Sequence, residues 1–108
     1  MDRALRALGF NRSCVAMLSY LIDNPGPHST SDITHETGVT QPGVTHCANK
    51  LQHFLITGTE PRKDGRDGKP RKTYMLRPLE EVREMLFFKI DLARKELDRH
   101  QKVISEAL

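Results

Sequence analysis

The 108-residue sequence lacks the features of a membrane-bound or exported protein. No apolar run approaches the length of about eighteen residues that a membrane-spanning helix requires. No charged start is followed by the apolar core of a signal peptide. We therefore expect a soluble, cytoplasmic protein with no membrane partner.

The sequence has two cysteines, Cys14 and Cys47, and no Cys-x-x-Cys motif. Both fall at inward-facing positions of expected helices, where free thiols pack as small hydrophobic groups. We expect both to be reduced. A redox-sensing pair remains an alternative, because two thiols on neighbouring helices can come close together.

Motifs for catalysis and for metal binding are also missing. No glycine-rich phosphate loop and no acyl-transfer nucleophile motif is present, so we do not expect an enzyme. The five histidines raise the alternative of a metal sensor. However, His46 and His53 are seven residues apart, whereas metal ligands on one helix usually sit about three or four apart. We expect no metal and no cofactor, and the sequence does not identify an effector.

Positive charge is concentrated in the middle of the chain. The formal net charge is only +3, but residues 55–77 carry seven Lys or Arg against three Asp or Glu, and the flanking segments are nearly balanced. Such a concentration is typical of a surface that meets phosphate. Aromatic residues make up only 6% of the chain, which argues against RNA binding by base stacking.

Residues 31–54 predict two short helices joined by a tight turn, a helix-turn-helix. Ser31 is a cap candidate for the first helix, and Gly38 stands where a chain leaving a helix needs positive φ. Thr40 can cap the second helix, and Pro42 falls in its first turn, where a missing N–H removes no helical hydrogen bond.

The second helix, expected from Gln41 to His53, is amphipathic. Apolar residues recur at three- and four-residue steps on one face, namely Val44, Cys47, Leu51 and Phe54. The opposite face is polar and carries Gln41, Gly43, Thr45, His46, Asn49, Lys50 and His53. Amide, hydroxyl and imidazole groups on such a face can meet base edges in a major groove.

Two further helices and a hairpin are expected around this unit. Residues 2–8 and 12–23 predict helices, the second capped by Asn11, that form the floor of the core. Residues 55–59 and 72–76 are rich in β-formers and predict an antiparallel hairpin. The loop between them, residues 60–71, contains Gly, Pro and Asp and few apolar side chains.

The stretch Gly-Val-Thr-Gln-Pro-Gly-Val-Thr-His-Cys-Ala-Asn-Lys-Leu at 38–51 resembles the turn and recognition helix of winged helix-turn-helix transcription regulators. The resemblance is closest to small archaeal regulators with ArsR-, TrmB- or MarR-like DNA-binding domains. The stretch Asp-Gly-Lys-Pro-Arg-Lys-Thr-Tyr-Met-Leu at 67–76 resembles their wing. Gly43 departs from the pattern, since such helices usually carry a larger residue there, which suggests a looser start of the helix.

This resemblance implies a mainly α fold with a small β-hairpin (α+β), in which residues 1–77 bind double-stranded DNA. The implied DNA-binding residues are Thr40, Gln41, Pro42, Thr45, His46, Asn49, Lys50, His53, Arg62, Lys63, Arg66, Lys69, Arg71 and Lys72. Arg66 and Arg71 are the best candidates for a minor groove. The alternatives are a merely solvated loop, or a winged helix that serves as a protein-interaction or RNA-binding module.

Residues 78–108 predict one long C-terminal helix for dimerisation. Pro78 suits a helix start, and no Gly or Pro follows it. A coiled-coil seam runs through Leu79, Leu86, Ile90, Ala93, Leu97, His100 and Ile104. We expect a homodimer whose recognition helices read a near-palindromic operator. Alternatively, the helix folds back on its own domain or binds another protein.

Overall fold

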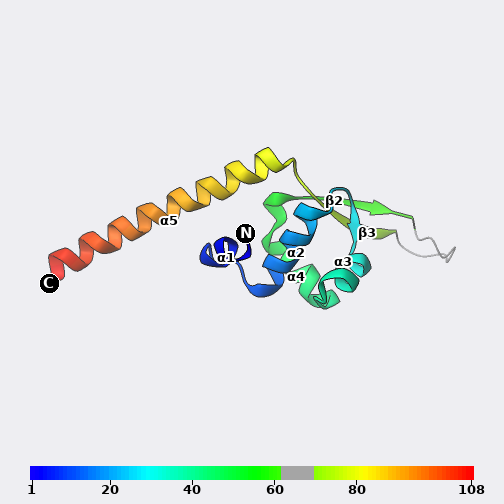
Figure 1. Ribbon diagram of the computed structural model, residues 1–108, viewed down its shortest axis with the longest axis horizontal. Coiled ribbons are helices and arrows are strands. Elements are labelled where there is room, and N and C mark those ends of the chain that lie inside the picture. The colour runs from blue at the N-terminus through cyan, green and yellow to red at the C-terminus, as the bar shows by residue number, and fades with distance from the viewer. Residues whose placement is uncertain (62–69) are drawn as a thin grey trace.

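A computed structural model shows a small helical body, a short sheet beside it and one long helix that projects from it (Figure 1). It describes residues 1–61 and 70–108. The overall dimensions are 67 × 26 × 22 Å, so the molecule is elongated. The elements in chain order are α1 (Asp2–Ala7), α2 (Arg12–Asp23), β1 (His28–Ser29), α3 (Thr30–Thr37), α4 (Gln41–Lys50), a 3-10 turn η1 (Gln52–Phe54), β2 (Leu55–Glu60), β3 (Arg71–Leu76) and α5 (Leu79–Ala107).

The core lies where α2 packs between the other helices of the body. Met17 and Leu18 of α2 are fully buried, and they pack with Ile33 of α3 and Val44 of α4. As predicted, Asn11 caps α2, because its side-chain oxygen accepts a hydrogen bond from the backbone N–H of Cys14 at 2.8 Å. The expected floor of the core is therefore confirmed.

The start of α3 differs from the prediction. The N-cap is Ser29 and not Ser31, because the backbone of Ser29 is extended and its hydroxyl accepts from the N–H of Asp32. The Asp32 carboxylate in turn accepts from the N–H of Ser29, which completes a capping box. Two backbone donors are satisfied reciprocally, so the earlier start is favoured.

The turn into α4 forms as predicted, but the helix ends early. Gly38 closes α3 with a φ of 77°, and the Thr40 hydroxyl accepts from the N–H of Gly43 as the cap of α4. The expected extent to His53 is wrong, because α4 ends at Lys50. A 3-10 turn follows, with the N–H of Phe54 bonded to the carbonyl of Leu51 at 2.8 Å, and it leads the chain directly into β2.

The sheet contains the expected hairpin and one strand more. β2 and β3 pair antiparallel from Leu55↔Leu76 to Glu60↔Arg71. The strand order is β1-β3-β2, so β3 lies in the middle of three strands. The two-residue strand β1 pairs His28 with Tyr74, and Ser29 with Thr73. Ser29 therefore ends β1 and, at the same time, caps α3.

The long C-terminal helix is confirmed. Its first turns join the core through Val82, which is only 3% exposed, while every residue from Asp91 to Leu108 is exposed. Figure 1 shows α5 running past α1 and away from the body. Within the part of the chain that the structure describes, no helix is apolar enough over sufficient length to span a bilayer.

Candidate nucleic-acid interface

The polar face of α4 is open to solvent. All eight residues that the sequence assigned to this helix and its cap are exposed, namely Thr40, Gln41, Pro42, Thr45, His46, Asn49, Lys50 and His53. The apolar face is closed, since Val44 and Cys47 have no exposed surface. The amphipathic pattern thus leaves the hydrogen-bonding groups free on the outer side of α4.

Five of these residues lie along one groove of about 690 Å³, namely Gln41, Pro42, Thr45, His46 and Asn49. Thr30, the first residue of α3, also lines the groove. The sequence pattern did not predict Thr30 as part of this surface, because its place in the groove follows from how α3 packs beside α4. The capping box that starts α3 at Thr30 is the sequence signal that points to this position.

Lys50 and His53 belong to a different part of the surface. They line a second groove of about 940 Å³, which Phe54 also lines and which α5 borders through Phe88 and Lys89. The ammonium group of Lys89 lies 5.3 Å from the ring centroid of Phe10 in the same groove. Lys50 and His53 therefore line a different groove from Gln41, Thr45, His46 and Asn49.

The basic residues of the loop between β2 and β3 fall into two groups. Arg71 is half-buried at the start of β3, opposite Glu60, and Lys72 beside it is exposed. The other four basic residues lie outside the described residues: Arg62, Lys63, Arg66 and Lys69. The basic character of the described loop end rests on Arg71 and Lys72.

Gly43 is tightly enclosed, contrary to the expectation of a loose start of α4. A Cβ atom at this position would lie 2.9 Å from Cγ1 of Val39 and 3.1 Å from Oγ1 of Thr40. Val39 is only 9% exposed, and Thr40 is the cap of the helix. Glycine is present here because the turn packs against the first turn of α4.

The two thiols lie directly behind this face. The Cys14 thiol donates a hydrogen bond to Sγ of Cys47, and the two Sγ atoms are 2.8 Å apart. Both cysteines are free and buried. Burial raises the pKa of Cys47 from 9.0 to about 12, and the neighbouring Cys14 adds to the rise, because its thiolate form accepts a hydrogen bond from protonated Cys47 and repels a second negative charge. The pair satisfies the proximity that redox sensing requires, but it keeps the reactive thiolate scarce.

A hydrogen-bonded histidine fixes the segment before β1. The Nε2–H of His28 donates to the carbonyl oxygen of Asn24 at 2.9 Å, which leaves Nδ1 as the acceptor for the hydroxyl of Tyr20 at 3.4 Å. Burial, with smaller contributions from Glu36 and Asp32, raises the pKa of Tyr20, so its hydroxyl stays protonated and available as a donor.

Among the described residues, no group of three or more His, Cys, Asp or Glu side chains is arranged to hold a metal ion. The five histidines are dispersed over β1, α3, α4, η1 and α5. The described surface offers polar and basic groups to a ligand, and no cluster of metal ligands.

Neither a protein-family model nor a curated protein matches this chain. Among solved structures, a "Possible transcriptional regulator from Methanosarcina mazei Go1" superimposes with a TM-score of 0.74 at 12% sequence identity. The match covers 94% of this chain and 85% of the other. This chain shares the overall fold of that solved structure. The similarity extends over the body and most of α5, so the long helix belongs to the shared architecture.

Proposed function

We propose that this chain is a winged helix-turn-helix transcription regulator, without enzymatic activity, that binds double-stranded DNA as a homodimer. In this proposal residues 1–77 form the DNA-binding unit and residues 78–108 the pairing helix. α4 enters the major groove, and the loop 60–71 is the wing, which contacts flanking phosphates or the minor groove.

One observation carries the proposal. The exposed face of α4 holds the hydrogen-bonding side chains of Gln41, Thr45, His46 and Asn49 beside Pro42, and these residues line a groove together with Thr30 of α3. Amide groups such as those of Gln41 and Asn49 pair with the edge of adenine, and Thr45 and His46 supply further donors and acceptors. The described residues of this face are neither acidic nor apolar, as a surface for a protein partner would be.

The position of the hairpin supports the same function. β3 is joined to the start of α3 through the pairing of Ser29 with Thr73. Lys72 and Arg71 directly precede Thr73 in β3, so both basic residues lie close in sequence to the point where the sheet meets α3. Basic side chains at this distance can hold phosphates while α4 contacts bases.

The similarity to a possible transcriptional regulator supports this proposal at the level of fold. The decisive experiment is fluorescence-anisotropy titration of random-sequence duplex DNA and of single-stranded RNA over a salt series. We expect duplex binding that weakens steeply with salt, since counterion release contributes much of the free energy. Absence of duplex binding at low salt, or tighter binding of RNA, would contradict the proposal.

A further inference from the structure

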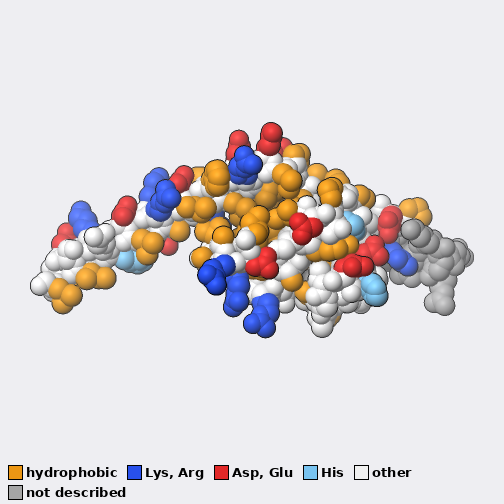
Figure 2. All heavy atoms as spheres, viewed as in Figure 1, with side chains coloured by type: hydrophobic (Ala, Val, Ile, Leu, Met, Phe, Trp, Pro, Cys, Tyr) orange, Lys and Arg blue, Asp and Glu red, His pale blue; other side chains and the backbone are white. Residues whose placement is uncertain are grey.

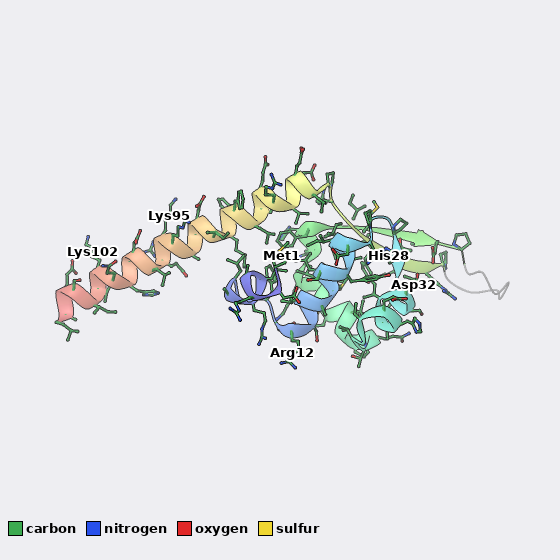
Figure 3. The ribbon with its side chains drawn as sticks, viewed as in Figure 1. Met1, Arg12, His28, Asp32, Lys95 and Lys102 are labelled. Carbon is green, nitrogen blue, oxygen red and sulfur yellow. The ribbon has the colours of Figure 1, made fainter. Side chains whose placement is uncertain are left out.

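α5 has an apolar stripe that its own body leaves uncovered. Leu97 and Ile104 are 68% and 57% exposed, although they continue the line of Leu86 and Ile90, which are half-buried. Figure 2 shows hydrophobic side chains along the edge of α5 that faces the α1 side. Figure 3 shows Lys95 and Lys102 pointing to the opposite side of the helix. The stripe therefore lies on the side of α5 that faces α1, opposite Lys95 and Lys102.

The stripe leads into an apolar groove between α1 and the first turns of α5. The groove has a volume of about 380 Å³. Ala4 of α1 and Leu8, the residue that follows α1, line one part of it, and α5 contributes Leu79, Leu86, Phe87 and Ile90. A helix lying on the uncovered stripe would enter this groove as it passes α1, so groove and stripe form one continuous surface.

We propose that a second copy of this chain occupies this surface, with the two α5 helices antiparallel and Ile90 opposite the partner's Ala93. This proposal deepens the proposed function, because it rests on the pairing of α5 with itself. In the antiparallel arrangement, the distal half of the partner's helix lies in the groove between α1 and α5. Leu86 then meets the partner's Leu97, and Leu79 meets the partner's Ile104.

Charge decides between antiparallel and parallel pairing. With Leu86 and Ile90 on the seam, Lys89, Glu96 and Arg94 flank it. A parallel pair in register places Lys89 against the partner's Arg94, two like charges. The antiparallel pair proposed here places Lys89 against the partner's Glu96, and two-fold symmetry repeats this attraction.

Charge also selects the register. Sliding one antiparallel helix by a heptad in one direction sets Lys89 against the partner's Lys89. Sliding it in the other direction sets Glu96 against the partner's Glu96. Among these three registers, only the one centred between Ile90 and Ala93 sets Lys89 against an acidic residue, and it also packs Ile90 against the small Ala93 at the centre. In this register Arg83 faces the partner's His100. The side chain of Arg83 is long enough to extend past that histidine and to keep its charged group in solvent.

The test is the dimer dissociation constant of the full chain, measured by sedimentation equilibrium, for charge-reversal variants. Glu96→Lys should raise it about tenfold, because two attractions become repulsions. Lys89→Glu should also raise the dissociation constant. The double variant K89E/E96K should return the constant to the value of the natural chain, because the opposite charges face each other again. Lys89→Glu alone does not decide the matter, because it also removes the contact of Lys89 with the Phe10 ring of the same chain. The deciding measurements are therefore the Glu96→Lys variant and its rescue by the double variant.

A parallel pair gives the opposite pattern. Glu96→Lys would then leave the constant unchanged, because residue 96 would face the partner's Gln101. Lys89→Glu would tighten the dimer by removing repulsion from the partner's Arg94. Either result, or a chain that stays monomeric at every concentration, would overturn the inference.

The groove is tested separately with α1. Ala4→Arg should weaken the dimer about tenfold or more, because it places a charge where an apolar partner helix must lie. Ala7→Arg is the matched control, since Ala7 is an exposed alanine of the same helix that does not line the groove. Equal effects of the two variants would remove α1 from the interface. The DNA titration is independent, so an antiparallel dimer that does not bind duplex would contradict only the proposed function.

Discussion

The Sγ atoms of Cys14 in α2 and Cys47 in α4 lie 2.8 Å apart, at the contact between the first long helix and the helix proposed to read DNA. Both cysteines are buried at this contact between two helices. Its position directly behind the polar face of α4 means that any covalent change of either sulfur would alter the packing under that face. The chemistry of the pair is therefore worth measuring.

We expect both thiols to resist modification in the folded protein. Cys14 and Cys47 are 1% and 0% exposed, and the pKa of Cys47 is raised to about 12, so little thiolate is present at pH 8. Mass spectrometry after treatment with iodoacetamide should find slow labelling of native protein and rapid labelling in guanidinium chloride. Rapid formation of a Cys14–Cys47 disulfide under mild hydrogen peroxide would instead indicate a redox sensor.

Stability should fall at alkaline pH. The pKa of Cys47 is raised from 9.0 to about 12 on folding, so its contribution is fully present below pH 9 and is lost as the pH rises toward 12. In that window the unfolded chain releases a proton that the folded chain retains, and the free energy of unfolding falls by at most about 1.4 kcal/mol per pH unit. Urea denaturation should show a steeper fall for the natural chain than for Cys47→Ala. Parallel curves would show that Cys47 does not titrate differently on folding.

Gly43→Ala should destabilise the protein by about 1 kcal/mol. Alanine is favoured in helices by about 1 kcal/mol, but the new Cβ would lie 2.9 Å from Cγ1 of Val39, and overpacking of a β-branched neighbour outweighs that gain. The measurement is chemical denaturation. In a Val39→Ala background the penalty should disappear, and a Gly43→Ala chain that is more stable than the natural one would show that the turn has room to adjust.

Arg71→Ala should weaken binding to all duplex sequences alike. If Arg71 neutralises one phosphate, its loss lowers the slope of log affinity against log salt by about one. Lys102→Ala removes the same charge from the far end of α5 and is the matched control. A salt slope equal to that of the control would exclude Arg71 from the proposed interface.

Asn49→Ala should change sequence preference more than overall affinity. A side-chain amide that pairs with a base edge discriminates by about 1–3 kcal/mol, whereas non-specific binding depends on phosphates. Selection of binding sites from a random duplex library, performed with both proteins, measures the effect. Identical selected sequences would show that the groove lined by Asn49 does not read bases.

Local rules predicted much of this fold. The caps at Asn11 and Thr40, the positive φ of Gly38, and the long helix after Pro78 follow from short-range sterics and hydrogen bonding, which neighbouring residues determine. The inward and outward faces of α4 follow from helical periodicity. Features of this kind need no knowledge of distant parts of the chain.

Most of the features that could not be predicted from the sequence depend on residues that are far apart in the chain. β1 is only two residues long, and His28 and Ser29 become a strand because β3, more than forty residues later, offers its free edge. The cap at Ser29 in place of Ser31 is an exception, because it follows from the local capping box with Asp32. The assignment of Thr30 to one groove, and of Lys50 to another, depends on how α3 and α5 pack beside α4.

The double role of Ser29 links the two halves of the proposed interface mechanically. A single residue is both the end of the sheet and the beginning of α3, with no flexible linker between them. Because Ser29 pairs with Thr73 and also caps α3, a displacement of β3 should shift the first turn of α3, where Thr30 lines the groove beside α4.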